Sequence, residues 1–165
     1  AQTAELSSQY YTEFSQYAAR VAKYDINSIT KLSTVDLKEG DGATIDDTTK
    51  FAAYYIGWNP DGTVFDQSIA DGALKAPIPV ETGLSTASLI QGWKDGIKGM
   101  KVGGVRELDI PSDLAYGEQG SKDASGKQTI APNTPLKFVV MAIPLPETIP
   151  EPQIPQALLS NGGLR

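Results

Sequence analysis

The sequence of 165 residues contains no cysteine and no histidine. Without cysteine there is no thiol nucleophile and no disulfide. Without histidine there is no imidazole base, no Ser-His-Asp triad and no ordinary zinc site. Any chemistry must therefore use carboxylates, hydroxyls, amines, backbone groups or the shape of a pocket. The absence of cysteine leaves the redox compartment open, because cytosolic and exported proteins can both lack it.

Basic residues are in the minority, since 14 Lys and Arg face 20 Asp and Glu, which gives a net charge of −6. This balance argues against a nucleic-acid partner, which would need a basic stripe. It argues equally against polybasic attachment to a membrane surface. No apolar run reaches the roughly 18 residues of a membrane-spanning helix. The length fits about one domain of 100–200 residues that builds its own core.

Residues 1–31 predict an amphipathic helix with its apolar residues on one face. Thr3 is suited to cap it, and Glu5 lies in its first turn. The face is made by residues spaced three or four apart, namely Leu6, Tyr10, Phe14, Tyr17, Val21 and Tyr24. Such a stripe usually packs on its own domain, which predicts a monomer. The alternative is a dimer seam, because the spacing is heptad-like, although too short for a stable coiled coil alone.

Residues 32–146 indicate an antiparallel α+β domain, because several strands surround a single helix instead of alternating with helices. The expected strands are 51–58, 63–66, 78–82, 105–110 and 136–143. A helix of about three turns is expected where one apolar face is formed by Leu89, Ile90, Trp93 and Ile97. The segment 117–130 is polar and contains glycine, which predicts a long loop.

The two ends of the chain differ from this body. Residues 147–165 predict a Pro-rich tail, which is either a linker or an extended arm, because proline cannot pack inside a helix or sheet. A Pro-rich ligand for another domain is the alternative. The chain begins Ala1-Gln2, without Met and without a signal-peptide pattern. These ends favour a soluble protein that is exported or in the cell envelope over a cytoplasmic one.

Familiar catalytic and metal-binding motifs are missing. There is no Gly-rich phosphate loop and no GxSxG turn. The acidic group Asp41, Asp46 and Asp47 lacks the spacing of a calcium loop, so a solvated turn explains it better. Carboxylate pairs for glycoside hydrolysis stay open, but nothing singles out one pair.

Five short runs carry the one positive signal. In order they are Tyr54-Tyr55-Ile56-Gly57, Asp61-Gly62-Thr63-Val64-Phe65-Asp66, Leu89-Ile90-Gln91-Gly92-Trp93, Ala115-Tyr116-Gly117, and Ile130-Ala131-Pro132 leading to Phe138. Each run alone is weak, but the five in this order and spacing resemble the FKBP-type peptidyl-prolyl cis-trans isomerases. The resemblance covers about residues 34–146. It implies a half-open antiparallel β-sheet wrapped around a short central α-helix.

The resemblance also implies a hydrophobic cup between helix and sheet. Trp93 would form its floor, and a backbone N–H at Ile90 would be offered to a substrate carbonyl. The residues expected to carry the reaction are Asp66 and Tyr116 at the rim, with Tyr55, Trp93 and Phe138 in the cup. The further expected substrate contacts are Phe65, Ile78, Leu89, Ile90, Ala115 and Ile130.

The implied activity is rotation about X-Pro bonds, which suits a chain without His or Cys because no covalent bond is made or broken. It calls for no metal and no cofactor. The implied partners are X-Pro peptides and unfolded proteins, with macrolides such as rapamycin as inhibitors. The alternative is a binding module or chaperone that has the same cup and little turnover.

The sequence departs from the family pattern at three places. Ile78, within Pro77-Ile78-Pro79, stands where the family usually has an aromatic residue, which is expected to weaken macrolide binding. Residues 83–88 are longer than in compact relatives, and this alters the approach to the helix. The loop 117–130 is also longer and more polar, so the preferred substrate stays open.

Overall fold

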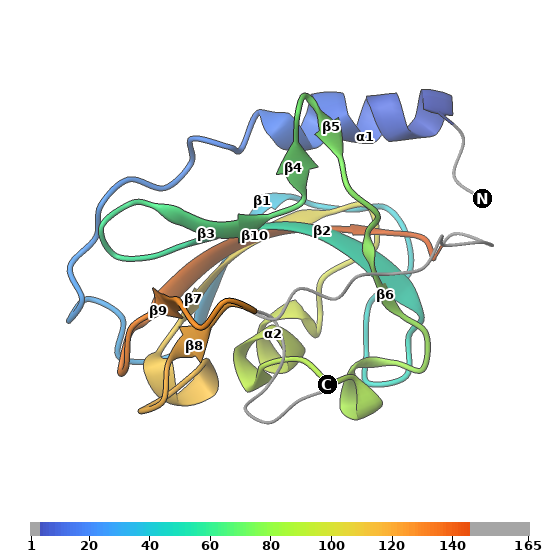
Figure 1. Ribbon diagram of the computed structural model, residues 1–165. Coiled ribbons are helices and arrows are strands. Elements are labelled where there is room, and N and C mark those ends of the chain that lie inside the picture. Colours follow the sequence, from blue (N-terminus) through green and yellow to red (C-terminus); the bar gives the residue numbers. More distant parts are fainter. Residues whose placement is uncertain (1–3, 146–165) are drawn as a thin grey trace.

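The computed structural model describes residues 4–145 (Figure 1). The expected cap at Thr3 and the expected tail at 147–165 lie outside the described residues. The helices are α1 (Ala4–Ser15) and α2 (Gln91–Ile97), with 3₁₀ turns at Leu84–Thr86 and Ser112–Leu114. The strands are β1 (Ser33–Lys38), β2 (Phe51–Trp58), β3 (Val64–Gln67), β4 (Ile69–Ala70), β5 (Ala73–Leu74), β6 (Ile78–Val80), β7 (Val105–Ile110), β8 (Ser121–Lys122), β9 (Gln128–Ile130) and β10 (Leu136–Ile143).

One antiparallel sheet forms the centre of the described chain. Its strand order is β1-β7-β10-β2-β3, and β6 also pairs with β2. β10 lies between β7 and β2, with Lys137 opposite Trp58 and Phe138 opposite Gly57. The sheet curves around α2, while α1 lies across its other face (Figure 1). This confirms the expected α+β fold of a half-open sheet wrapped around a short helix.

The face of the sheet turned toward α2 carries the larger core. Alternate residues of β2 and β10 contribute to it, including Tyr55 and Phe138, and α2 contributes Trp93. α2 can lie close to β7 because Gly92 has no side chain, and a Cβ there would collide with Ile110. The helix is therefore fixed against the strands that face it.

The outer face of the sheet is covered by the N-terminal segment, whereas many antiparallel sheets leave one face in water. Phe14 is fully buried there, and its ring lies 6.4 Å from that of Tyr54. The Tyr10 ring lies 5.9 Å from the same tyrosine. Tyr17, Val21 and Tyr24 pack against this outer core as well. The aromatic stripe therefore packs on its own domain.

The N-terminal helix is shorter than the sequence predicts, since it ends at Ser15 and not at residue 31. Beyond it the chain forms tight turns and extended backbone. In a continuing helix the Tyr24 N–H would donate to the carbonyl four residues earlier. Instead it donates to the Pro60 carbonyl at 2.9 Å. Tertiary bonding to the β2–β3 turn thus replaces the helix, although the apolar spacing still places the aromatic residues on the sheet.

Other elements also differ from expectation. α2 begins at Gln91, so Leu89 and Ile90 reach the core from extended chain and the helix has about two turns. The segment 117–130 is not a bare loop, because β8 and β9 pair within it. The strand β1 and the small β4–β5 hairpin were not anticipated. Their residues are short or largely exposed runs without a clear alternation of apolar and polar side chains.

Candidate functional site

Four aromatic rings from four elements meet on the α2 side of the sheet. The Trp93 ring of α2 contacts Tyr55 of β2 at 5.6 Å and Phe138 of β10 at 5.5 Å between centroids. The Phe65 ring of β3 stands at 90° to Phe138, again at 5.5 Å. All three contacts are edge-to-face, the arrangement that aromatic quadrupoles favour. The expected floor and walls of the site are therefore brought together.

Gly57 makes this packing possible, since it lies opposite Phe138 on β10 and opposite Asp66 on β3. A Cβ on Gly57 would lie 2.5 Å from the Phe65 ring and 2.8 Å from the Phe138 ring. Real Cβ atoms do not approach so closely, so only glycine lets both rings lie over the strand. The glycine quoted in the sequence motif thus has a steric role in the site.

Asp66 is the charged group of the site and lies on β3. Its side chain is 19% exposed, and one carboxylate oxygen accepts the Gln67 N–H at 2.9 Å. The Lys75 ammonium lies 3.8 Å from the same oxygen. Lys75 follows β5, and no sequence motif predicts that it meets Asp66, because the pairing depends on the path of the β4–β5 hairpin.

Two buried tyrosine hydroxyls share the electrostatic field of Asp66. Burial raises the pKa of Tyr55, and the nearby Asp66 charge raises it further. The pKa of Tyr116 is raised by the same two causes. The Tyr116 hydroxyl and the indole N–H of Trp93 make no hydrogen bond to another described residue, whereas the Tyr55 hydroxyl also interacts with the Asp66 side chain. Since buried polar groups are normally paired, two unpaired donors in one site indicate positions for a ligand's acceptors.

The backbone at the start of α2 offers another donor. Ile90 is extended, with φ −60° and ψ 149°, and its carbonyl accepts the Trp93 N–H at 3.1 Å. No described residue accepts a hydrogen bond from the Ile90 N–H itself. Helix N-termini leave such donors unpaired and carry partial positive charge. This donor suits a carbonyl oxygen.

The remaining expected residues belong to the same core or pack against it. Ile78, Leu89, Ile90 and Ile130 are all buried in the core that contains Trp93, and Ala115 packs against it. Ile130 ends β9, so the unanticipated β8–β9 hairpin is what carries it to the site. Ten of the eleven residues that the resemblance implied therefore belong to this core or pack against it, and the charge of Asp66 acts on two of them, Tyr55 and Tyr116.

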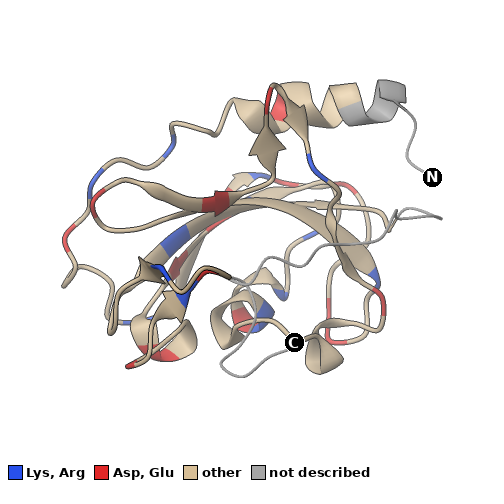
Figure 2. Ribbon diagram, viewed as in Figure 1, with Lys and Arg blue, Asp and Glu red and all other residues tan. Residues whose placement is uncertain are grey.

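Charge does not distinguish the site from the rest of the molecule. Figure 2 shows basic and acidic residues interspersed over strands and loops. Among residues 4–145, no three acidic side chains gather closely enough to hold a metal ion. Neither helix within those residues has the length and apolar run needed to cross a membrane. The aromatic cluster with its unpaired donors is thus the feature that marks the site.

Comparison with known proteins decides the family. Residues 40–143 match the FKBP-type peptidyl-prolyl cis-trans isomerase family. The chain belongs to this family. An FK506-binding protein of Streptomyces anulatus is 38% identical over 109 residues, which is 66% of this chain and 81% of that protein. An FK506-binding protein of Neisseria meningitidis is 38% identical over 86 residues, covering 52% of this chain and 74% of the relative.

Solved structures agree with this FKBP-type assignment. The crystal structure of AtFKBP13 superposes with a TM-score of 0.58 at 30% identity, covering 70% of this chain and 93% of that one. A peptidyl-prolyl cis-trans isomerase from Pseudomonas syringae has a TM-score of 0.55 at 28% identity, covering 89% of this chain and 98% of that one. The FKBP-type protein described here is accordingly a peptidyl-prolyl cis-trans isomerase.

Proposed function

We propose that the chain accelerates cis-trans exchange of X-Pro bonds in peptides and folding proteins at the site built on Trp93. The single observation that supports this most is the edge-to-face cluster of Tyr55, Trp93 and Phe138, with unpaired buried donors beside it. An apolar wall with a few donors is what a reaction without covalent chemistry requires.

The physical problem is rotation about an amide bond. Rotation breaks the resonance of the amide, at about 20 kcal/mol, so uncatalysed exchange takes tens of seconds. In the twisted amide the nitrogen no longer shares its lone pair, and the group is less polar than the planar form. An aromatic environment that excludes water therefore favours the twisted state over the planar ground state. A difference of about 5 kcal/mol would accelerate exchange several-thousand-fold.

Each polar group then has a role in holding the peptide in register. The Tyr116 hydroxyl donates to a substrate carbonyl, and so does the N–H of Ile90. Because burial and Asp66 raise the pKa of Tyr116, its hydroxyl keeps its proton. Asp66 orients neighbouring donors, including Tyr55, and interacts with the displaced carbonyl. No acid or base role is assigned to it.

A protease-free X-Pro assay tests the proposal, with Asp66→Ala compared against the parent. Glu81→Ala is a matched control, since Glu81 is an exposed acid just beyond β6 without a bonding partner among the described residues. We expect the parent to accelerate exchange, Asp66→Ala to lose at least several-fold, and Glu81→Ala to match the parent. A folded parent that leaves exchange at its uncatalysed rate would mean that the family likeness describes only the fold.

The same site is the proposed binding place for macrolides of the FK506 and rapamycin type. Rapamycin added to the assay should compete with the peptide. Ile78 presents less aromatic surface than the family pattern, so we expect weaker inhibition than for relatives with a ring there, and Ile78→Phe should strengthen it. Inhibition that does not respond to this change would place macrolide binding elsewhere.

We further propose that the protein is a monomer. Tyr10, Phe14 and Tyr17 face the outer core of their own sheet and are not presented as a seam for a second copy. Sedimentation should give one species near 17.6 kDa. A species of twice that mass would favour the dimer. The exported or cell-envelope location stays a prediction, which fractionation of the source cells would test.

A further inference from the structure

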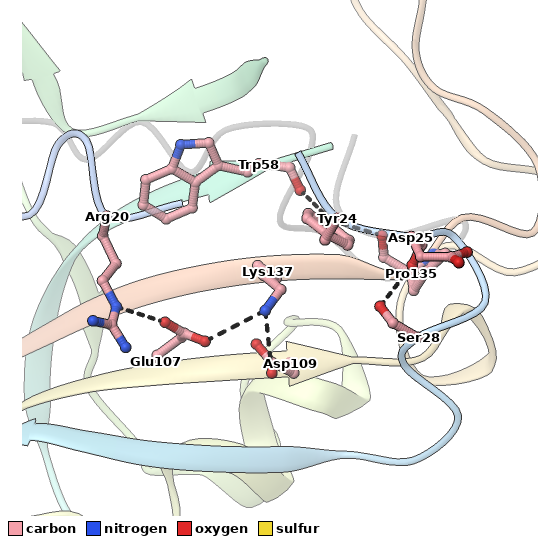
Figure 3. A network of polar contacts seen from close by, with 9 residues as sticks. All are labelled: Arg20, Tyr24, Asp25, Ser28, Trp58, Glu107, Asp109, Pro135 and Lys137. Atoms are coloured by element: carbon pink, nitrogen blue, oxygen red, sulfur yellow. Dashed lines mark hydrogen bonds and ion pairs between the residues drawn. The ribbon is translucent and has the colours of Figure 1, made fainter. Parts of the chain in front are cut away.

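The chain between α1 and β1 crosses the outer face of the sheet, and its residues 16–25 are here called the N-terminal arm. Tyr17, Val21 and Tyr24 pack on the outer core. The Arg20 guanidinium donates to a carboxylate oxygen of Glu107 on β7 at 2.9 Å, as Figure 3 shows. The arm is thus held by apolar packing along its length and by a charge-assisted hydrogen bond near its middle.

Tyr24 bonds to three carbonyls, one at the end of β2, one in the β2–β3 turn and one just before β10. Its hydroxyl lies 2.9 Å from the Trp58 carbonyl oxygen and 3.0 Å from that of Pro135. Its backbone N–H donates to Pro60 at 2.9 Å. Trp58 ends β2, and Pro135 directly precedes β10. One side-chain hydroxyl therefore spans the ends of the two central strands (Figure 3).

The sheet needs a donor at this point. Pro135 has no N–H, so the ladder between β2 and β10 cannot continue past the start of β10. Carbonyl groups left there would lack partners unless water or a side chain supplied them. Burial raises the pKa of Tyr24, so its hydroxyl keeps the proton that the two carbonyls share. The Lys137 ammonium lies 5.2 Å from the centre of the Tyr24 ring and further holds the ring in place.

The aromatic site begins one residue further along both strands. Trp58 is followed inward by Gly57, and its partner Lys137 by Phe138, and these two inner residues are again paired. The Gly57 backbone has no spare space against the rings of Phe65 and Phe138. A change in the spacing or twist of the two strand ends must therefore move those rings.

From these contacts we infer that Tyr24 is a positioning residue of the isomerase site. Its hydroxyl holds the ends of β2 and β10 at the separation that places Phe138 edge-on to both Trp93 and Phe65. Tyr24 touches no substrate and acts through the strand ends. This inference rests on the proposed function, since it assigns Tyr24 to the same site.

The test compares Tyr24→Phe with Tyr17→Phe in the full chain. Tyr24→Phe keeps the ring on the sheet and removes only the bridging hydroxyl. Tyr17→Phe removes a hydroxyl from the same arm that bonds to no described residue. Both are assayed on an X-Pro peptide at about 10 °C, where uncatalysed exchange takes minutes, and circular dichroism at that temperature verifies folding. The amide resonances of Gly57 and Phe138 are recorded in parallel.

We expect Tyr24→Phe to lower kcat/KM about three- to tenfold, through kcat and not KM, because ring orientation acts on the twisted amide. The Gly57 and Phe138 amides should shift in this variant only, and Tyr17→Phe should keep the parental rate. A Tyr24→Phe protein with the parental rate overturns the inference, and so does a slower one whose Gly57 and Phe138 amides stay in place. An inactive parent would instead overturn the proposed function, and the amide shifts would still decide whether Tyr24 sets the strand ends.

Discussion

The indole of Trp93 meets the ring of Phe138 edge-on, with centroids 5.5 Å apart and planes at 87°. Tyr55 stands against the same indole at 72°. Trp93 thus joins α2 to the two central strands of the sheet, and its own N–H is unpaired within the described chain. Such aromatic pairs contribute about 0.5–1.5 kcal/mol each beyond the area they bury. The residue is therefore central to both the core and the proposed reaction.

Replacing Trp93 should separate its contribution to stability from its contribution to catalysis, provided that a second buried tryptophan, Trp58, is replaced in a parallel variant. We expect Trp93→Leu to lower the free energy of unfolding by about 2–4 kcal/mol and to lower kcat/KM at least about tenfold. Trp58→Leu changes an equally buried tryptophan on the outer face and should cost similar stability with a smaller loss of rate. Urea unfolding and the X-Pro assay measure both quantities. Equal losses of rate in the two variants would argue that only stability matters.

Gly57→Ala adds a single methyl group to the site. It would overlap the rings of Phe65 and Phe138, so these rings must leave their present positions over the strand. Overpacking of this kind destabilises by about 1–3 kcal/mol. We expect kcat/KM to fall more steeply than stability, and the near-ultraviolet circular dichroism of the aromatic residues to change. Parental activity would show that the rings are free to move without consequence.

Tyr116→Phe should move stability and activity in opposite directions. The hydroxyl is buried without a partner among the described residues, so its removal relieves an unpaired polar group and should leave the protein as stable as the parent or slightly more so. The same change removes the proposed donor to the substrate, which should lower kcat/KM by about tenfold. A less stable Tyr116→Phe would indicate that the hydroxyl is satisfied in the folded protein.

The carboxyl pair on β7 predicts a pH effect on stability. Burial, followed by the neighbouring Glu107, raises the pKa of Asp109 to about 6 from an ordinary 3.8. Burial also acts to raise the pKa of Glu107, but Arg20, Asp109 and Lys137 outweigh it, and that pKa is lowered. Between pH 3.8 and 6 the folded chain binds the Asp109 proton more tightly than the unfolded chain does. This contribution to stability is present below pH 3.8 and is lost as pH rises through 6.

Asp109→Asn should remove that loss. At pH 8 we expect the free energy of unfolding of the variant to exceed that of the parent by about 1–2 kcal/mol, a figure reduced because Asp109 is partly exposed. At pH 4 the two proteins should be equally stable. Urea unfolding at several pH values measures the difference. Lys137→Met is a useful companion, because removing the nearby cation should raise the pKa of Asp109 further. A difference that is the same at every pH would contradict the assignment.

Two of the central strands, β2 and β10, were predictable because nearly all their residues are apolar, and β7 because apolar residues follow the Gly103-Gly104 break. Phe51 to Trp58 is buried on both faces, and β7 and β10 have the bounds that the sequence suggests. The ends of the helices were not predictable, since apolar spacing cannot distinguish a helix from an extended chain that faces the same core. Leu89, Ile90 and Tyr24 are apolar or aromatic at helical spacing, yet each lies outside a helix. Tertiary hydrogen bonds decided the outcome at Tyr24.

In the site, too, local motifs were predictable from the sequence and tertiary pairings were not. Its residues were found because five motifs keep the family order, and each brings side chains that one local turn or strand positions. Lys75 beside Asp66 and Tyr24 beside Pro135 had no such signal. They join residues 9 and 111 positions apart through the path of a hairpin and of an arm, and a single sequence records neither path.

The burial of β2 on both faces changes how substitutions in this strand are to be judged. On a sheet with a wet outer face, Ala52, Tyr54 and Ile56 would be the permissive positions, where polar residues accumulate among relatives at little cost. Here all three are covered. A residue that is acceptable in a relative without the N-terminal segment can therefore be damaging in this chain. Whether a substitution at these positions is tolerated can therefore be inferred only from relatives that also have the N-terminal segment, and not from the shared domain alone.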